Sequence, residues 1–492
     1  MGRPDGVGKG EAEAMDSRRV VAWRVAFRLA CLAVVLGLAA CGGGGEEGGD
    51  QATPGVGTGT PSAATAAPSG DAVEISLWHS ETASNLDSLQ SLARRFNDSQ
   101  SEVKVKLAFQ GTSDENMAKM LASLQGGGLP TIAYLDEVQA QRLIDSAGFR
   151  PVQEFIDEEE YDLSDFDPKT IQYYTVDGDL WAMPISISVP VLLYNKLTFR
   201  EVGLDPEKPP RDLDELKEVS RKFVKRDSHG NLMRTGISLE IHPWYLEVAL
   251  AEHGDLYLNN ANGHEDRATA VEFDGPTGQA FFQWWHDMVK EGLALDVGLA
   301  QVSPDAILAV GAGQVVMTRS STSVLRSVVD ALEGGLAQTE VEPGLAVSPG
   351  IPGGTGYTAV YTRGLWIPED LPEAEQEAGW KFIKWLMEPE QQAEWFAGSG
   401  YLPVRNSSYD LPAAQEIMAK YPQFRTGVEI FRSSPATPAT LGPVLGPFNE
   451  VRQAVLTQLQ ETIVGDKDPM QAISDAAEEA NQVIEDYNRR IQ

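Results

Sequence analysis

Cysteine and histidine are scarce in this sequence, and their scarcity restricts the sites that it can build. Among 492 residues there are two cysteines, Cys31 and Cys41, and six histidines. Both cysteines stand in the first 41 residues, so the rest of the chain can form neither a disulfide framework nor a cysteine zinc site. Because the histidines are scattered, no histidine-built metal site is expected. We therefore expect no metal and no bound cofactor.

Positive charge is scarce as well. The chain has 39 Lys and Arg residues against 72 Asp and Glu residues, which gives a formal net charge of −33. Nucleic-acid binding depends on clustered basic side chains that neutralise phosphates, so we expect no nucleic-acid partner. The excess of acidic residues is typical of a solvated, soluble surface.

The common signatures of catalysis are also missing. The sequence contains no GxxxxGK[ST] phosphate loop and no HExxH zinc motif, and Gly398-Ser399-Gly400 does not match a GxSxG nucleophile turn. A secreted hydrolase would need a nucleophile or a pair of carboxylates, and the sequence points to neither. We therefore expect a binding protein and not an enzyme, with a secreted hydrolase as the less favoured alternative.

An apolar run near the N-terminus, residues 29–40, is too short to span a bilayer but typical of a signal-peptide core. Arginines at 18, 19, 24 and 28 precede it, and it closes on the letters LAAC, a pattern similar to a bacterial lipobox. The sequence thus predicts a lipoprotein signal peptide over residues 1–40 and an acyl chain on Cys41. Export by the general or the twin-arginine route, and a start at Met1 or Met15, both stay open.

The stretch after Cys41, up to residue 72, consists mainly of Gly, Ala, Pro, Ser and Thr. It lacks the apolar residues that a core needs, so we interpret it as a flexible tether with a reach of roughly 30 Å. We therefore expect an exported protein that is anchored to the outer face of the cell membrane by acylated Cys41.

From residue 73 onward, short apolar strands alternate with amphipathic helices. Strands are predicted at Val73–Trp78, Val103–Leu107 and Pro130–Leu135, and helices at Ser84–Phe96 and Asn116–Leu124. This βαβαβ order indicates an α/β fold with a largely parallel sheet. The remaining length is too great for one sheet, so we expect two lobes with a ligand cleft between them.

Several later segments resemble one known family. They read PISISVPVLLYNKLTFREVGLDPEKPPRDLDEL (184–216), VVMTRSSTSVLR (315–326), GLWIP (364–368) and AEWFAGSGYLPVRNSSYD (393–410). Together with the lipobox they resemble extracellular solute-binding protein family 1 of bacterial ABC importers. Within this family the chain is most similar to the members that bind sn-glycerol-3-phosphate.

The resemblance implies a two-lobed periplasmic-binding-protein-like fold of class II, whose lobes are joined by crossover segments. Lobe 1 is expected over residues 73–186 plus about 319–368, and lobe 2 over residues 187–318 plus about 369–492. It also implies a monomer that delivers a small polyol phosphate, or else a sugar, to permease subunits in the membrane.

The resemblance carries over to a set of ligand-binding candidates in segments that match the family. These are Tyr401 of GYLP, Arg452 of PFNEVR as the phosphate contact, Ser321, Ser188, Trp244 as a stacking residue, and Glu137 for hydroxyl groups, with Asp136 as its off-by-one alternative.

The residues themselves add weaker candidates. Trp78 and His79 end a strand, where a cleft residue would stand, and the guanidinium groups of Arg319 and Arg363 suit phosphate. Ser186 lies in the first crossover segment. Residues 320–322 are expected to precede a helix, where their N–H groups either attract an anion or are simply capped.

Three departures from the family pattern affect the predicted pocket. An expected tyrosine is replaced at Ser113 or Asp114, a second tryptophan falls near Ile241, and a Gly-Gly pair is replaced within residues 361–363. We expect a protein that captures sn-glycerol-3-phosphate or a glycerophosphodiester by hinge closure. A sugar-binding protein of a carbohydrate importer is the alternative.

Overall fold

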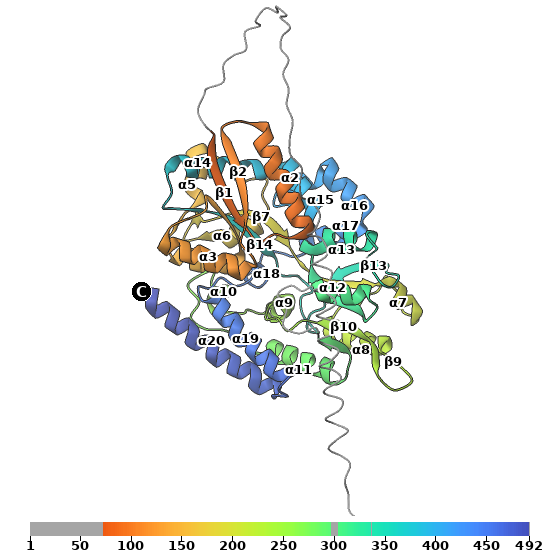
Figure 1. The fold of residues 1–492 in the computed structure, drawn as a ribbon. Coiled ribbons are helices and arrows are strands. Elements are labelled where there is room, and N and C mark those ends of the chain that lie inside the picture. Colours follow the sequence, from red (N-terminus) through yellow and green to blue (C-terminus); the bar gives the residue numbers. More distant parts are fainter. Residues whose placement is uncertain (1–71, 297–303, 336, 492) are drawn as a thin grey trace, which may run out of the picture. The chain divides into compact units, whose positions relative to one another are not determined.

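The computed structural model describes residues 72–296, 304–335 and 337–491 (Figure 1). Residues 69–492 form one compact unit. The predicted signal peptide, the predicted acylation site Cys41 and the tether lie outside the described residues. Within the described ranges, no helix has the length and apolar character that crossing a membrane requires.

The first sheet has the strand order β2-β1-β3-β14-β4, and β7 also pairs with β14. β1, β2 and β3 run parallel, as the βαβαβ pattern predicts, whereas β14 is antiparallel to β3, β4 and β7. The sheet is therefore mixed, and the prediction of a largely parallel sheet holds for its first three strands. The strands are β1 Val73–His79, β2 Val103–Phe109, β3 Ile132–Asp136, β4 Phe149–Arg150, β7 Met183–Ser188 and β14 Tyr361–Pro368.

The second sheet has the order β11-β10-β12-β8-β13, with β9 paired to β10. Its strands are β8 Pro190–Asn195, β9 Lys225–Arg226, β10 Leu232–Leu239, β11 Ala294–Asp296, β12 Val315–Ser321 and β13 Pro343–Val347. A separate hairpin pairs β5 Thr175–Val176 with β6 Asp179–Leu180.

Buried apolar side chains fall into two large clusters, one around each sheet. We call the elements around them the first lobe and the second lobe; in Figure 1, β1 and α14 stand above and β10 and α11 below. The first cluster receives side chains from α2 Ala83–Ser99, α3 Ser113–Gly126, α4 Ala140–Asp145, α5 Val152–Glu159, α6 Pro168–Tyr174, α13 Leu325–Glu333, α14 Glu373–Leu386, α15 Pro389–Ser399, α16 Pro412–Lys420 and α17 Pro422–Ser433.

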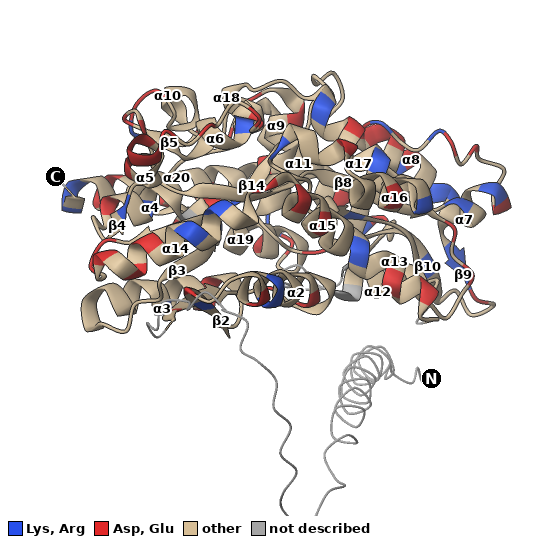
Figure 2. Cartoon of the chain, turned by 90° about the horizontal axis from the view of Figure 1, so that it is seen from above, with Lys and Arg blue, Asp and Glu red and all other residues tan. Residues whose placement is uncertain are grey.

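The second cluster receives side chains from another set of helices. These are α7 Lys196–Glu201, α8 Leu213–Phe223, α9 Trp244–His253, α11 Pro276–Lys290, α19 Phe448–Ile463 and α20 Pro469–Ile491. Short segments complete the fold: α10 Asn259–Asn262, α12 Pro304–Gly311, α18 Pro438–Leu441, and the 3-10 turns η1 Glu137–Gln139, η2 Thr322–Val324 and η3 Asn406–Asp410. Figure 2 shows acidic and basic residues interspersed on helices of both lobes.

This architecture confirms the predicted two-lobed α/β fold. The chain crosses between the lobes where β7 leads into β8, where β12 leads into η2 and α13, on entering and leaving β13, and between α17 and α19. Residues 378–431, placed with the second lobe by the sequence, bury their side chains in the first cluster instead. α14 lies against β1 and α15 lies against α2, whereas α17 also packs against β13 of the second sheet.

Local sequence explains why the elements form where they do. In β1, Ile75, Leu77 and His79 are buried in alternation, which is the period of a strand. Thr112 and Glu115 form a reciprocal capping box that starts α3, and the Asp212 side chain accepts a hydrogen bond from the Glu215 N–H at the start of α8.

The contact between β10 and α8 gives a test of packing in the second lobe. A methyl group on Gly236 would lie 2.3 Å from Cβ of Ser220 and 2.5 Å from its Cα. We expect Gly236→Ala to lower the free energy of unfolding by about 1–3 kcal/mol, because strand and helix must separate. Gly126→Ala is the control, since no atom lies within 4 Å of its added methyl. Thermal unfolding should separate the two variants, and equal melting temperatures would contradict this packing.

Candidate functional site

Two carboxylates of the first lobe hold the guanidinium group of Arg363. Asp136 ends β3 and stands opposite Arg363 in the ladder with β14, with its Oδ1 2.5 Å from Nε. Glu81 follows β1, is 3% exposed, and places Oε1 2.5 Å from Nη1. Burial disfavours the charged guanidinium, but the two carboxylates outweigh it, and the pKa of Arg363 lies above its usual range.

Aromatic rings flank this cluster. The Arg363 guanidinium lies 5.6 Å from the ring centre of Tyr134 and 5.7 Å from that of Tyr401. Tyr401 stacks on Trp395, with ring centres 5.7 Å apart and planes 7° apart. Ser186 is fully buried behind them, where its Oγ accepts a hydrogen bond from Trp395 Nε1 and lies 2.9 Å from the Tyr134 hydroxyl. Ser186 therefore helps to fix the orientation of the Tyr134 and Trp395 rings.

The second lobe contributes Arg452 on α19. Its Nε and Nη2 donate to the two carboxylate oxygens of Glu247 on α9, both at 2.7 Å. The guanidinium also lies 4.8 Å from the ring centre of Phe448. Because the Glu247 side chain is only 1% exposed, this bidentate pair fixes the direction of Arg452.

Glu137 stands at the junction of the two lobes. Burial and the neighbouring Asp136 raise its pKa to about 8, whereas Arg452 and Arg363 act in the opposite direction. Its carboxyl thus lies within electrostatic reach of an arginine from each lobe. The next residue, Val138, buries its side chain in the second cluster although it follows a strand of the first sheet. The turn η1 therefore brings the first lobe against the second.

Trp244 and its neighbours form the apolar side of this region. The ring of Trp244 lies 5.5 Å from that of Tyr361, and its backbone N–H donates to His242 Nδ1. Burial, and then the charge of Arg452, lower the pKa of His242 to about 3, so this ring is neutral at neutral pH. Trp244 and Tyr361 thus border the Arg452–Glu247 pair.

The serine candidates lie at the crossovers between the lobes. Ser188 ends β7 opposite Tyr361, and the Ser321 Oγ lies 2.5 Å from the Ser323 Oγ. Asn85 Nδ2 donates to the Ser323 carbonyl and to Glu81 Oε2, which links this turn to the carboxylates around Arg363.

Residues 320–322 do not directly precede a helix, as the sequence suggested. Residues 319–321 pair with residues 190–192 of β8, so β12 extends to Ser321. A 3-10 turn follows, and α13 begins only at Leu325. The α-helix thus begins later than expected, and anion binding by the N–H groups of residues 320–322 stays a prediction.

Three of the weaker candidates lie inside the lobes. Trp78 packs on the first cluster, and His79 is buried, with Nδ1 accepting a hydrogen bond from the Glu81 N–H. The Arg319 side chain is 1% exposed, donates from Nε to Ser348 Oγ at 3.0 Å, and lies 3.6 Å from Glu252. These contacts give Arg319 a partner in the interior of the second lobe.

Sequence reasoning missed Glu81, Glu247 and Tyr361 as members of the site. Glu81 stands two residues after the flagged His79, so a carboxylate beyond the end of a strand was a usable signal. The sequence offered no such signal for Glu247, because the residues around it in its helix are almost all buried and apolar.

The junction offers four carboxylates (Glu81, Asp136, Glu137 and Glu247), two guanidinium groups (Arg363 and Arg452) and several aromatic faces. Such a set can bind hydroxyl groups, can contact an anion through the arginines and can stack on a sugar ring. No group of three or more His, Cys, Asp or Glu side chains that could hold a metal occurs in the part of the chain that the structure describes.

Comparison with known proteins gives consistent results. The sequence profile of the family described as bacterial extracellular solute-binding protein matches residues 91–426. The sn-glycerol-3-phosphate-binding periplasmic protein UgpB of Pectobacterium atrosepticum is 28% identical over 426 residues, which is 85% of this chain and 93% of that protein. UgpB of Escherichia coli K12 is 27% identical over 424 residues, which is 84% of this chain and 93% of that protein.

Solved structures share the fold. UgpB from Mycobacterium tuberculosis in complex with glycerophosphocholine has a TM-score of 0.70 at 20% identity, covering 85% of this chain and 99% of that one. The cyclic α-maltosyl-1,6-maltose binding protein from Arthrobacter globiformis has a TM-score of 0.67 at 24% identity, covering 84% of this chain and 100% of that one.

The position of Glu137 predicts a pH dependence of stability. A carboxyl whose pKa is raised to about 8 in the folded protein takes up a proton on folding, so it favours folding at low pH. Its contribution is lost as the pH rises from about 4.5 through 8. We expect Glu137→Gln to flatten the fall in melting temperature between pH 5 and 8, measured by calorimetry. Parallel curves for the variant and the wild type would contradict the assignment.

Proposed function

The chain belongs to the bacterial extracellular solute-binding protein family, and we propose that it is the substrate-binding component of an ABC importer for sn-glycerol-3-phosphate or a glycerophosphodiester. It captures this ligand outside the cell and delivers it to the permease. The proposal involves no bond-making step, and its ligand follows from the UgpB relatives that share most of the chain.

One observation in the structure supports the proposal most. Glu137 from the first lobe lies within electrostatic reach of Arg452 from the second lobe and of Arg363 from its own. A ligand that contacts both sides of this junction stabilises the closed arrangement of the lobes, which is how hinge closure retains a solute.

Arg452 is the phosphate contact in this proposal. Nε and Nη2 are directed at Glu247, and in the described part of the chain Nη1 makes no hydrogen bond. A phosphate oxygen can approach from that side. Glu137 and Asp136 then accept hydrogen bonds from the glycerol hydroxyls, and Tyr401 covers the site beside Arg363.

A neutral sugar is the second candidate ligand, and a specific observation favours it. Both arginines are already paired with carboxylates, Arg363 with Glu81 and Asp136, and Arg452 with Glu247. The junction therefore carries no excess of positive charge toward a phosphate. Trp244 and Tyr361 provide the aromatic faces on which sugar rings stack.

Export and anchoring complete the proposal. The predicted signal peptide directs the chain out of the cell, and acylation of Cys41 holds it at the outer face of the membrane as a monomer. The following tether, with a reach of roughly 30 Å, lets the folded body meet the permease.

The ligand assignment predicts a loss of binding on changing Arg452. Arg452→Lys keeps the charge but removes the bidentate geometry, and we expect sn-glycerol-3-phosphate and glycerophosphocholine to bind at least tenfold more weakly by isothermal titration calorimetry. Arg150→Lys is the matched control. Arg150 is similarly buried (15% against 17% exposed), is paired with Glu154 and lies 4.1 Å from the ring centre of Phe155, but it belongs to the first lobe alone.

The same titrations decide between the two candidate ligands. Binding of the phosphates but not of maltose, lost in Arg452→Lys and kept in Arg150→Lys, supports the proposal. Binding of maltose alone would keep the transport function and overturn the phosphate assignment.

Anchoring predicts a change in fractionation. Cys41→Ser removes the acylated sulfur, so we expect the protein to move from the membrane fraction to the soluble exported fraction, with no incorporation of labelled palmitate. A variant that stays on the membrane and still carries the label would contradict anchoring through Cys41.

A further inference from the structure

We propose that Arg142 and Asp145 on α4 form a latch that holds the two lobes closed and so positions the ligand site. The latch is defined here as these two residues and their partners in the second lobe: Arg267, Gly446, Glu450 and Tyr487. This inference rests on the proposed function for its effect on binding, whereas its effect on lobe closure stands without any ligand.

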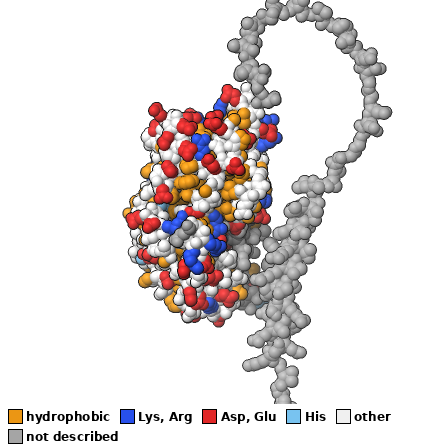
Figure 3. Space-filling model, turned by 90° about the vertical axis from the view of Figure 1, so that its left-hand side faces the viewer, with side chains coloured by type: hydrophobic (Ala, Val, Ile, Leu, Met, Phe, Trp, Pro, Cys, Tyr) orange, Lys and Arg blue, Asp and Glu red, His pale blue; other side chains and the backbone are white. Residues whose placement is uncertain are grey.

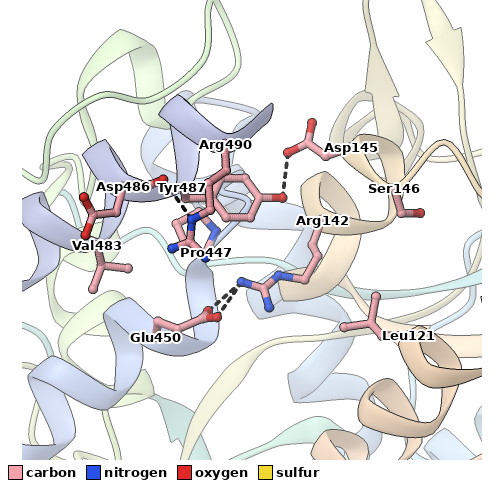
Figure 4. Close-up of a pocket in the computed structure, with 10 residues that line it drawn as sticks. All are labelled: Leu121, Arg142, Asp145, Ser146, Pro447, Glu450, Val483, Asp486, Tyr487 and Arg490. Carbon is pink, nitrogen blue, oxygen red and sulfur yellow. Dashed lines mark hydrogen bonds and ion pairs between the residues drawn. The ribbon is translucent and has the colours of Figure 1, made fainter. Parts of the chain in front are cut away.

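The first half of the latch is Arg142. Its Nη2 lies 2.7 Å from both carboxylate oxygens of Glu450 on α19, and its Nε donates to the Gly446 carbonyl at 3.0 Å. α4 buries Ala140 and Leu143 in the first cluster, whereas α19 packs in the second. One guanidinium group therefore makes three hydrogen bonds from one lobe to the other. Figure 4 shows those between Arg142 and Glu450.

The second half is Asp145, at the end of α4. Arg267 donates two hydrogen bonds to its carboxylate, from Nη2 to Oδ1 at 2.6 Å and from Nη1 to Oδ2 at 2.9 Å. The Tyr487 hydroxyl also donates to Oδ2, at 2.9 Å. The Asp145 side chain is only 6% exposed. Arg267 precedes Ala268 of the second cluster and Tyr487 lies on α20, so both partners belong to the second lobe.

Tyr487 joins the two halves. The Arg142 guanidinium lies 5.5 Å from its ring centre, and the ring packs so closely on Gly446 that a Cβ there would lie 2.2 Å from it. These groups border a pocket of about 360 Å³ whose walls come from α3 and α4 on one side and from α19 and α20 on the other (Figure 4). Figure 3 shows basic side chains gathered at mid-height on the face that lies at the left of Figure 1.

The latch is built on the elements that form the ligand site. Arg142 follows Glu137 by five residues, through η1 and α4, and Glu450 precedes Arg452 by two residues on α19. Contacts between α4 and α19 therefore bring Glu137 and Arg452 to their positions. In Figure 1 the end of α20 lies on the opposite side from α13, to which the crossover from β12 leads.

The chemistry of the latch explains how it acts. Hydrogen bonds between an arginine and a carboxylate are charge-assisted, and each half of the latch has them. Arg267 and Asp145 form a bidentate pair, whereas Arg142 reaches both oxygens of Glu450 through Nη2 alone. If the closed state binds the ligand, the apparent affinity falls in proportion to the fraction of molecules that are closed. Arg142 and Asp145 are thus positioning residues that need no contact with the ligand.

The test compares Arg142→Ala with the charge exchange Arg142→Glu plus Glu450→Arg. Spin labels on cysteines introduced at the exposed positions Asp98 and Lys222 report the distance between the lobes, in protein whose two natural cysteines are replaced by serine. Without ligand, we expect Arg142→Ala to lengthen and broaden this distance, and to weaken sn-glycerol-3-phosphate binding about three- to tenfold. The charge exchange should restore both values to within about twofold.

Arg200→Ala is the matched control. Arg200 also pairs with one carboxylate, binding both oxygens of Glu342 at 2.7 and 2.8 Å, but both residues belong to the second lobe. We expect it to change neither distance nor affinity. A wild-type distance in Arg142→Ala, or a charge exchange no better than Arg142→Glu alone, would overturn the latch. If the wild type binds no phosphate ligand, the proposed function fails, and the distance measurement still decides the latch.

Discussion

A carboxyl group that is buried at the junction of two lobes beside a second acidic side chain resists ionisation, and the arrangement around Glu137 depends on this constraint. Burial next to Asp136 raises its pKa, and the two opposing groups come from different lobes, Arg363 on β14 and Arg452 on α19. Each arginine is held by its own carboxylates, so the positive charge is fixed before any ligand arrives. The junction is therefore preorganised, and closing the lobes completes it.

Polar contact between the lobes extends beyond the ligand site. On α4, Arg142 and Asp145 bind partners in the second lobe. Such contacts are directional and individually modest, which suits a junction that must open and close. The apolar clusters each centre on one sheet, although the first also takes in Val191, Leu193 and Leu345 of the second sheet.

The apolar pattern was sufficient to predict β1, β2, β3 and the helices between them, because burial alternates along β1 and β2, is continuous along β3 and recurs at helical spacing in α2. It was not sufficient to assign residues 378–431 to a lobe, since an amphipathic helix shows that a face is buried but not against what. Resemblance to a family supplied Arg452 and Tyr401. The pairing of Arg363 with Glu81 could not be predicted from the sequence, because the two residues are 282 positions apart and only the folded sheet brings them together.

The central claim is that Glu137 and Arg452, from opposite lobes, act on the ligand as one site. A double-mutant cycle with Glu137→Gln and Arg452→Lys, measured as the dissociation constant of sn-glycerol-3-phosphate at pH 7, tests it most directly. The account predicts a coupling energy of about 1 kcal/mol or more between the two changes, because both side chains contact the same bound ligand. Strictly additive effects would contradict a shared site.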